Sequence, residues 1–303
     1  MTLFSDQAYF LTGPTASGKT ALALEWAEKR NAEILSMDAY AIYCGMDIGT
    51  AKPTREERAR VPHHLMDLVE PSAEFSVADY VAAAETAVRD ILARGRAPLF
   101  VGGTPLYLKA LLFGLFDSPP ADLALRESLR LQAENALQAG DATFLHRQLQ
   151  ACDPQTAARL HPNDTKRLIR ALEVFQLTGQ PIHAFQTQFA REVPPEVLQR
   201  IHLVEIPRAE LRQRIDLRVE QMFAQGLLDE VAALAERYPQ LSLTAAAAVG
   251  YREIFPFLEA QRRGETPSLD ELKETIKANT RHVAKRQCTW FRSLLNRPTY
   301  LQD

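Results

Sequence analysis

Eight residues near the start of the chain have the spacing of a phosphate-binding loop. The pattern G-x-x-x-x-G-K-[ST] is met by Gly13, Pro14, Thr15, Ala16, Ser17, Gly18, Lys19 and Thr20. The glycines allow a turn in which successive N–H groups point at one anion. Lys19 adds a positive charge, and the Thr20 hydroxyl can hold a magnesium ion that bridges two phosphates. We therefore expect a diphosphate or triphosphate ligand, although the loop does not say which molecule carries it.

Two further polar side chains follow predicted strands. Asp38 ends an apolar run that begins at residue 33. Its carboxylate could take a proton from an acceptor or hold magnesium indirectly, or it could only cap a turn. Thr104 follows two glycines, which let a ligand approach the backbone closely. Its hydroxyl could bond a ligand, cap the helix that is predicted to begin at Pro105, or do both.

Arginines of the helix that follows residue 206 could bind phosphate oxygens. Arg214 and Arg218 are four residues apart and share a helix face, and Arg212 lies nearby. The alternative is ion pairing with the neighbouring acids Glu210, Asp216 and Glu220.

The segment 275–297 is basic and contains no Asp or Glu. Its basic residues are Lys277, Arg281, Lys285, Arg286, Arg292 and Arg297. Trp290 and Phe291 lie among them, and basic side chains with aromatic rings suit a phosphate backbone and stacked bases. A solvated basic helix face is the alternative. A second basic group consists of Lys166, Arg167 and Arg170.

The order of the predicted elements places the phosphate loop, Asp38 and Thr104 at one edge of a sheet. We expect strands at 9–11, 33–38 and 97–101, and helices at 21–27 and 76–94. Alternating strands and helices predict a P-loop NTPase-like α/β fold, in which a parallel sheet is flanked by helices. Ligands of such sheets bind beyond the carboxyl ends of the strands.

The pattern becomes helical at residues 121–188, with a break at 139–141 and helix starts near 154 and 164. A strand-like run returns at 201–206, and the rest is mainly helical. We therefore expect an all-helical insertion domain, 118–197, within a core of 1–117 and 198–303 that has a helical C-terminal region.

Composition excludes several classes of protein. The 303 residues are 46% hydrophobic with a net charge of −3, so any nucleic-acid surface must be local. No apolar run reaches the ~20 residues of a membrane helix, and no signal peptide is expected. The three cysteines are far apart, which fits a reducing cytoplasm and argues against a zinc site. The histidines have no metal-ligand spacing, and His63 and His64 would point to opposite faces of a strand.

The chain resembles the bacterial tRNA dimethylallyltransferases, also called tRNA isopentenyltransferases. The resemblance rests on motifs that run in the family order over nearly the whole chain. They are 11–20 (LTGPTASGKT), 36–38 (SMD), 42–53 (IYCGMDIGTAKP), 62–67 (PHHLMD), 101–104 (VGGT), 163–167 (NDTKR), 170–173 (RALE), 250–253 (GYRE) and 285–292 (KRQCTWFR).

The resemblance implies transfer of a dimethylallyl group from dimethylallyl diphosphate to N6 of adenine 37, the base 3′ of the anticodon, in tRNAs that read codons beginning with U. The phosphate loop would then hold a diphosphate leaving group, together with Arg218 and magnesium on Thr20. Lys19, Asp38 and Thr104 would be catalytic, with Asp38 removing a proton from the adenine amine. The target base must leave its stack.

The same resemblance implies contacts with the tRNA anticodon stem-loop from both the core and the insertion. These residues are Asp38, Ala39, Tyr40, Ala41, Thr104, Arg126, Asn163, Asp164, Lys166, Arg167, Lys277, Arg281, Lys285 and Arg286. Many family members have Ser and Gln where this chain has Ala39 and Ala41. Polar contacts from those two positions are therefore not expected.

The resulting prediction is a cytoplasmic, monomeric, magnesium-dependent tRNA prenyltransferase. One alternative is a P-loop kinase that uses ATP to phosphorylate a small metabolite. A second is an adenylate prenyltransferase acting on free AMP or ATP. A non-catalytic RNA-binding module would not need Lys19, Thr20 and Asp38 together.

Overall fold

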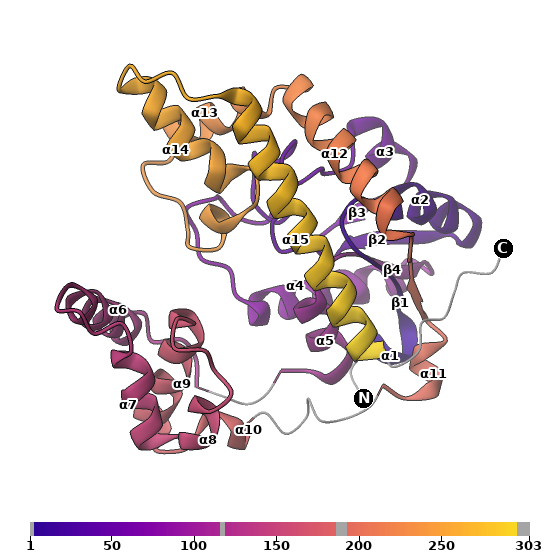
Figure 1. Ribbon diagram of the computed structural model, residues 1–303. Coiled ribbons are helices and arrows are strands. Elements are labelled where there is room, and N and C mark those ends of the chain that lie inside the picture. The colour runs from indigo at the N-terminus through magenta and orange to yellow at the C-terminus, as the bar shows by residue number, and fades with distance from the viewer. Residues whose placement is uncertain (1–2, 116–118, 186–192, 296–303) are drawn as a thin grey trace. The chain divides into compact units, whose positions relative to one another are not determined.

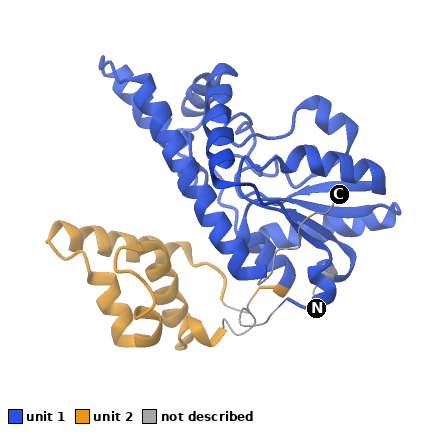
Figure 2. Ribbon diagram, turned by 45° about the vertical axis from the view of Figure 1, so that its right-hand side comes forward, with its two compact units in different colours: residues 1–112, 193–303 blue, residues 113–192 orange. Residues whose placement is uncertain are grey.

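The computed structural model describes residues 3–115, 119–185 and 193–295 (Figure 1). The chain divides into two compact units, one made of Met1–Leu112 with Val193–Asp303 and the other of Phe113–Glu192 (Figure 2). The second unit begins and ends five residues before the predicted insertion domain of 118–197. The role of this unit as an RNA-contacting domain stays a prediction.

The first unit is built on a five-stranded parallel sheet with the order β3-β2-β4-β1-β5. Its strands are β1 (Tyr9–Thr12), β2 (Ala32–Ser36), β3 (His63–His64), β4 (Ala97–Gly102) and β5 (Ile201–Leu203). Helices flank the sheet (Figure 1), so the predicted fold class is confirmed. The predicted strands 33–38 and 201–206 are shorter than expected, because the chain turns at Asp38 and Pro207 precedes the next helix.

Some helices of this unit pack on the sheet, and those between residues 208 and 295 share a further hydrophobic core. The helices of the unit are α1 (Leu3–Gln7), α2 (Lys19–Arg30), α3 (Arg55–Arg60), α4 (Val77–Ala93), α5 (Pro105–Phe113), α11 (Pro195–Leu198), α12 (Arg208–Ala224), α13 (Leu227–Arg237), α14 (Tyr251–Arg262) and α15 (Leu269–Leu295). A short 3₁₀ turn, Ala245–Ala247, precedes α14. The helices predicted at 21–27 and 76–94 correspond to α2 and α4, whereas α3 was not predicted.

Local sequence explains the bounds of α4. The Asp79 N–H donates to Ser76 Oγ at 3.2 Å, and the Ser76 N–H donates to Asp79 Oδ2 at 2.8 Å, which forms a capping box at the start of the helix. Buried residues then recur at helical spacing, at Tyr80, Ala84 and Val88. This face packs on the sheet, so the predicted helix is confirmed.

Among the hydrophobic clusters of the described residues, two join distant parts of the first unit. One lies between α2 and the sheet and includes Leu11, Leu24, Ile34 and Leu99. The other joins the segment 42–46 to α12, α13, α14 and α15. The long helix α15 runs beside α12 (Figure 1). The second cluster therefore brings residues from the start and the end of the chain into one core.

The second unit contains helices joined by turns, and no strand, in the residues that the structure describes between 119 and 185. Its helices are α6 (Leu123–Gln138), α7 (Phe144–Cys152), α8 (Pro154–Ala157), α9 (Thr165–Thr178) and α10 (Ile182–Phe185). They enclose a core of their own that includes Leu129, Leu149 and Leu168. Asp153 and Asp164 cap α8 and α9 by accepting backbone N–H groups at 3.0 and 3.3 Å. The predicted helix starts are thus confirmed.

Crossing a bilayer requires a long apolar helix, and none occurs in the part of the chain that the structure describes.

Candidate active site

The phosphate-binding loop connects β1 to α2 and depends on glycine at two positions. Gly13 has a φ of +152°, and a Cβ added there would lie 2.6 Å from the Val204 carbonyl oxygen. Gly18 has a φ of +87°, in the left-handed region that disfavours other residues. The loop therefore has the turned backbone that its sequence predicts, with α2 beginning at Lys19.

Lys19 is folded back onto this loop. Its Nζ donates hydrogen bonds to the carbonyl oxygens of Pro14 at 2.7 Å and of Gly13 at 3.0 Å. Burial lowers the pKa of Lys19 to about 7, with Arg218 adding to the shift and Asp38 opposing it. A bound anion would favour the charged form. Lys19 is thus placed to gain its charge when a phosphate group arrives.

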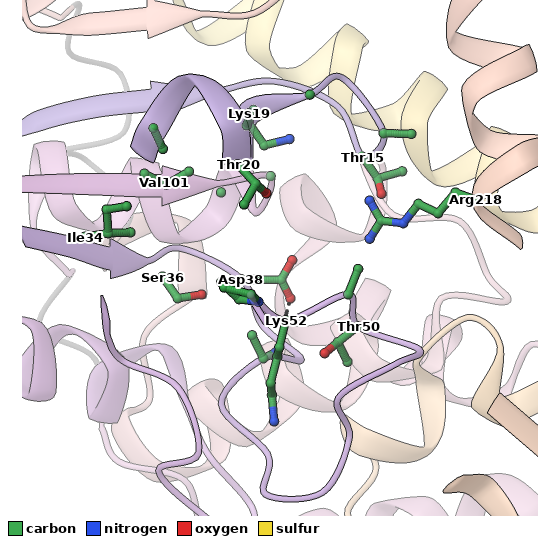
Figure 3. A pocket seen from close by; sticks show the side chains of 18 of the residues that line it. Thr15, Lys19, Thr20, Ile34, Ser36, Asp38, Thr50, Lys52, Val101 and Arg218 are labelled. Carbon is green, nitrogen blue, oxygen red and sulfur yellow. Dashed lines mark hydrogen bonds between the residues drawn. The ribbon is translucent and has the colours of Figure 1, made fainter. Parts of the chain in front are cut away.

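A cavity of about 370 Å³ opens beside the loop (Figure 3). The loop contributes Thr15, Lys19 and Thr20, and the carboxyl ends of the strands contribute Ser36, Asp38 and Gly103. Arg214 and Arg218 reach it from α12, and Thr50, Lys52 and His63 line its other side. Figure 3 shows the Asp38 carboxylate pointing into the space that the Arg218 guanidinium approaches. Ligand binding beyond the strand ends was predicted, and the cavity lies there.

Backbone donors orient the Asp38 carboxylate. Its Oδ1 accepts hydrogen bonds from the N–H groups of Tyr40 at 2.9 Å and Ala41 at 3.3 Å. Asp38 therefore does form the turn that was weighed as its alternative role, but the same turn aims the carboxylate into the cavity.

Thr104 holds the neighbouring residue. Its Oγ1 accepts a hydrogen bond from the Ala39 N–H at 3.1 Å, while the start of α5 is satisfied by its backbone carbonyl, which accepts from the Tyr107 N–H at 3.1 Å. The hydroxyl thus bonds the Asp38 segment and does not cap the helix. Its own hydrogen can still be donated to a ligand.

Arg218 is partly buried, and the resulting loss of solvation lowers the pKa of its guanidinium, while Asp38 acts in the opposite direction. An arginine nevertheless stays charged in proteins. Arg214 pairs with Glu210 at 2.5 Å, which is the alternative that the sequence left open, and it also lines the cavity. Arg218 is therefore the arginine best placed for an anion.

A second cavity, of about 130 Å³, adjoins the first. Both are lined by Thr15, Asp38, Thr50, Arg218 and Gln287. The second cavity also has the polar residues Tyr40 and Thr104 on its wall. Most of its remaining lining is apolar, including Val219, Met222, Leu227, Val249 and Ile276. Two ligands that occupy the two cavities would therefore meet beside Asp38 and Arg218.

One wall of the site is a loop that an internal carboxylate holds in place. Glu230 on α13 accepts hydrogen bonds from the N–H groups of Asp47, Ile48 and Gly49 at 3.0, 2.8 and 3.2 Å. The side chain of Lys52 is only 1% exposed, and its Nζ donates to the Tyr43 carbonyl oxygen at 2.6 Å and pairs with Asp47 at 2.7 Å and Asp67 at 2.5 Å. These bonds fix the segment that presents Thr50 to both cavities.

Gln287 on α15 reaches the phosphate loop. Its Oε1 accepts a hydrogen bond from the Thr15 N–H at 2.8 Å, and its Nε2 donates to the Gly103 carbonyl oxygen at 2.7 Å. The C-terminal helix is therefore part of the site.

The residues present fit a magnesium ion bound mainly through its ligand. Thr20 and Asp38 both offer oxygens to the cavity. Within the described residues, no group of three or more His, Cys, Asp or Glu side chains is placed to hold a metal. Mg²⁺ commonly uses one or two protein oxygens together with phosphate and water.

A shallow basic hollow lies on the outer side of α14 and α15. It is lined by Arg252, Asn279, His282, Lys285, Arg286, Thr289 and Trp290. Trp290 is 40% exposed, and Lys109 Nζ lies 5.5 Å from the centroid of its ring. Cationic groups beside an exposed indole suit phosphates and a stacked base. Lys285 and Arg286, two of the predicted RNA contacts, are thus placed together.

The other two predicted RNA contacts on α15 have acidic partners. Lys277 pairs with Glu220 at 2.7 Å, and Arg281 pairs with Asp216 at 2.5 Å. Both acids belong to α12, so these cations face the neighbouring helix. Their contact with RNA stays a prediction.

In the second unit, the predicted RNA contacts differ in what surrounds them. Arg126 binds the buried Glu173 carboxylate with two bonds of 2.8 and 2.9 Å. Arg167 pairs with the helix-capping Asp164 at 2.9 Å, and Asn163 and Lys166 are exposed. These roles also stay predictions.

Sequence reasoning missed the residues that position the site. Glu230, Gln287 and Lys52 act through contacts with distant parts of the chain, and no local pattern marks them. Lys52 and Gln287 do lie within the motifs 42–53 and 285–292, but neither of these two residues was assigned a role. His63 also lines the cavity, and burial lowers the pKa of its imidazole.

The parallel sheet with flanking helices and the glycine-rich loop after β1 define an α/β fold of the P-loop type, with two adjoining cavities beyond the strand ends. The sequence model of the IPP transferase family matches residues 41–294, and that of the isopentenyl transferase family matches residues 6–66. The chain belongs to the IPP transferase family, which confirms the family that the motifs indicated.

Related proteins support this placement. The tRNA dimethylallyltransferase of Geobacter metallireducens is 47% identical over 281 residues, which cover 92% of this chain and 87% of that protein. That of Rhodopirellula baltica is 46% identical over 298 residues, covering 95% and 86% of the two chains.

Solved structures are also similar. The crystal structure of the tRNA isopentenylpyrophosphate transferase of Bacillus halodurans has a TM-score of 0.62 and 38% identity, and the match covers 95% of this chain and 87% of that one. A eukaryotic dimethylallyltransferase acting on tRNA has a TM-score of 0.71 and 28% identity, with 94% and 69% covered.

Proposed function

We propose that this chain transfers a dimethylallyl group from dimethylallyl diphosphate to N6 of the adenine 3′ of the anticodon in tRNA. The observation that carries the proposal is that Asp38 and Arg218 line both cavities. A diphosphate in the larger cavity and a purine in the smaller one would then meet between a carboxylate and a guanidinium. The relatives named above act on tRNA, which supports this acceptor.

The diphosphate would bind to the N–H groups of the phosphate loop, to Lys19 and to Arg218. As the bond between the allylic carbon and the diphosphate oxygen breaks, negative charge grows on the leaving group, and these donors stabilise it. When bound, a magnesium ion on Thr20 supplies further neutralisation of that charge.

The acceptor would lie in the smaller cavity, beside Asp38, Tyr40 and Thr104. Its exocyclic nitrogen attacks the allylic carbon, one C–N bond replaces one C–O bond, and the Asp38 carboxylate takes the proton that the nitrogen loses. The Thr104 hydroxyl can donate to the base, because its oxygen already accepts from Ala39. The apolar lining of the same cavity excludes water from the transfer.

The RNA around the target base would contact the basic hollow through Lys285, Arg286 and Trp290, and the insertion through Asn163, Lys166 and Arg167. Contacts with phosphates supply much of such affinity, and the flipped base supplies specificity. Magnesium dependence, a monomeric state and action in the cytoplasm belong to this proposal.

Incorporation of labelled dimethylallyl diphosphate into an RNA hairpin tests the proposal. The hairpin carries three adenines after the anticodon, and a control hairpin has hypoxanthine at the target position, which lacks the N6 amine. We expect label only on the first hairpin, with magnesium and without ATP. In parallel reactions that contain AMP or ATP, labelled AMP would indicate the free-nucleotide enzyme, and consumption of ATP with a small acceptor would indicate the kinase.

The variant Asp38→Asn separates binding from chemistry. Asn can still accept the two N–H bonds of the turn but cannot take a proton, so turnover should fall at least 100-fold. The dissociation constant for the hairpin should stay within about twofold, because the turn is kept. Full turnover of Asp38→Asn would rule out Asp38 as the base.

A further inference from the structure

The Gln287 side chain bridges the phosphate loop and the segment that follows β4. Its oxygen accepts from the Thr15 N–H at 2.8 Å, and its nitrogen donates to the Gly103 carbonyl oxygen at 2.7 Å. Thr15 belongs to the phosphate loop, and Gly103 precedes Thr104 at the end of β4. One amide group therefore joins the phosphate loop to the end of β4, next to Thr104.

The two partners of this bridge suit an amide, which can accept with its oxygen and donate with its nitrogen. A carboxylate could accept from Thr15 but could not donate to Gly103, and an ammonium group could donate but not accept. A Cβ on Gly103 would lie 2.6 Å from Gln287 Nε2, so that glycine leaves the space that the amide fills. Gln287 also lines both cavities, so the bridge borders the space where the two substrates would meet.

The helix that carries Gln287 has a second surface. Lys285, Arg286 and Trp290 of α15 line the basic hollow, within three residues of Gln287. A single unbroken helix, Leu269–Leu295, thus presents cations to the surface and an amide to the phosphate loop.

We propose that Gln287 is a positioning residue that sets the shape of the diphosphate site from the helix of the basic hollow. This rests on the proposed function only in naming the anion as a diphosphate. Gln287 holds the Thr15 N–H at a fixed distance from the strand end, so the loop is shaped before an anion binds. Loss of the bridge should weaken diphosphate binding and leave RNA binding unchanged.

Binding of inorganic diphosphate to the free enzyme is the first measurement, made by calorimetry for the wild type, Gln287→Ala and Gln287→Glu. We expect Gln287→Ala to raise the dissociation constant about tenfold, equivalent to the loss of about 1.4 kcal/mol. The dissociation constant for the RNA hairpin should stay within about twofold. Gln261→Ala and Gln261→Glu are matched controls, since Gln261 is an exposed residue of α14.

The pH dependence of diphosphate binding by Gln287→Glu distinguishes loss of the hydrogen bonds from loss of packing. The ionised carboxylate of this variant cannot donate to Gly103, but its protonated form restores a donor beside an acceptor. The ratio of its dissociation constant to that of the wild type should therefore fall toward one between about pH 7.5 and pH 5. The same ratio for Gln287→Ala should not change with pH. If diphosphate binds more tightly to Gln287→Glu than to Gln287→Ala at low pH, the loss of charge repulsion alone cannot explain the recovery.

Two results would overturn the inference: wild-type diphosphate affinity in folded Gln287→Ala, or a Gln287→Glu variant that recovers no further than Gln287→Ala. Thermal unfolding of each variant shows that it is folded. Because the diphosphate measurement involves no RNA and no prenyl transfer, the inference about Gln287 stands even if tRNA is not the acceptor. Failure of the wild type to bind diphosphate would instead contradict the proposed function.

Discussion

The Tyr251 hydroxyl donates a hydrogen bond of 2.5 Å to the Glu230 carboxylate, which also holds three successive N–H groups of the loop at residues 47–49. The Tyr251 ring leaves no room for a side chain at Gly49, where an added Cβ would lie 2.4 Å from it. Burial and Glu230 raise the pKa of the Tyr251 hydroxyl. The wall of the cavity that carries Thr50 is therefore positioned by two residues of helices α13 and α14.

Glu230→Gln should destabilise the fold. Each Glu230 oxygen accepts two hydrogen bonds, and an amide would turn its NH₂ group toward two of those four donors. We expect a loss of about 2–4 kcal/mol in the free energy of unfolding, measured with urea. Glu236→Gln, an exposed change on the same helix, should cost less than about 0.5 kcal/mol. Equal effects of the two variants would contradict this role.

Diphosphate binding should depend on pH through Lys19. In the free enzyme the pKa of Lys19 is lowered to about 7 by burial, and a nearby anion would favour the charged form and so raise that pKa. Above pH 7 the complex must therefore take up a proton, so the association constant should fall by up to tenfold per pH unit, while below pH 7 the Lys19 contribution is constant.

The control for this pH dependence is Lys19→Arg, which stays charged throughout the range. Calorimetry in buffers of different ionisation enthalpy gives the number of protons taken up. The variant should show no Lys19 contribution to that number at pH 8. An identical proton uptake by variant and wild type would assign the pH dependence to another group.

Charge reversal in the basic hollow should weaken RNA binding selectively. The double variant Lys285→Glu, Arg286→Glu removes two candidate phosphate contacts, so the slope of log K against log[salt] should become shallower by about 1–2. Inorganic diphosphate should bind as in the wild type. Lys29→Glu, an exposed reversal at the end of α2, is the single-charge control. An unchanged slope would place the RNA elsewhere.

Arg126 should be needed for the fold of the insertion before any RNA binds. It binds the buried Glu173 with two bonds, and Arg126→Ala would leave that carboxylate with fewer donors. We expect faster hydrogen exchange in α6 and α9 of the full chain, equivalent to a loss of about 2–3 kcal/mol. Arg130→Ala on the same helix breaks only exposed pairs and should cost less than about 1 kcal/mol. Hydrogen exchange as in the wild type would show that Arg126 does not stabilise the fold of the insertion.

The sequence predicted those parts of the fold that depend on local pattern. The loop at 13–20, strands β1 and β4, and helices α2 and α4 follow from glycine spacing, apolar runs and capping residues. Strand β2 was predicted too long, because nothing in the run 33–38 shows that Asp38 will bond the N–H groups of Tyr40 and Ala41. The short α3 has no buried residue, so it carries no apolar periodicity to find.

The site residues also fall into those that local sequence predicts and those that depend on distant contacts. Asp38, Thr104 and Arg218 were found because they stand at strand ends or repeat at helical spacing. Glu230 and Gln287 could not be found, since the backbone groups that they bond lie more than 180 residues away in the chain. The sequence of α15 alone also does not show that Lys277 and Arg281 face α12, where Glu220 and Asp216 pair with them.

The bond between Thr15 and Gln287 joins residues 272 positions apart. During synthesis the phosphate loop emerges early, but the strand that packs on Gly13 and the helix that bonds Thr15 are translated only after the whole insertion. A ribosome working at about 5–20 residues per second needs roughly 15–50 seconds to cover that interval. Throughout it the nascent chain has a phosphate loop without the Gln287 bond, so anion binding at full affinity begins only when translation is nearly finished. The ligand site is therefore completed only after nearly the whole chain has been translated.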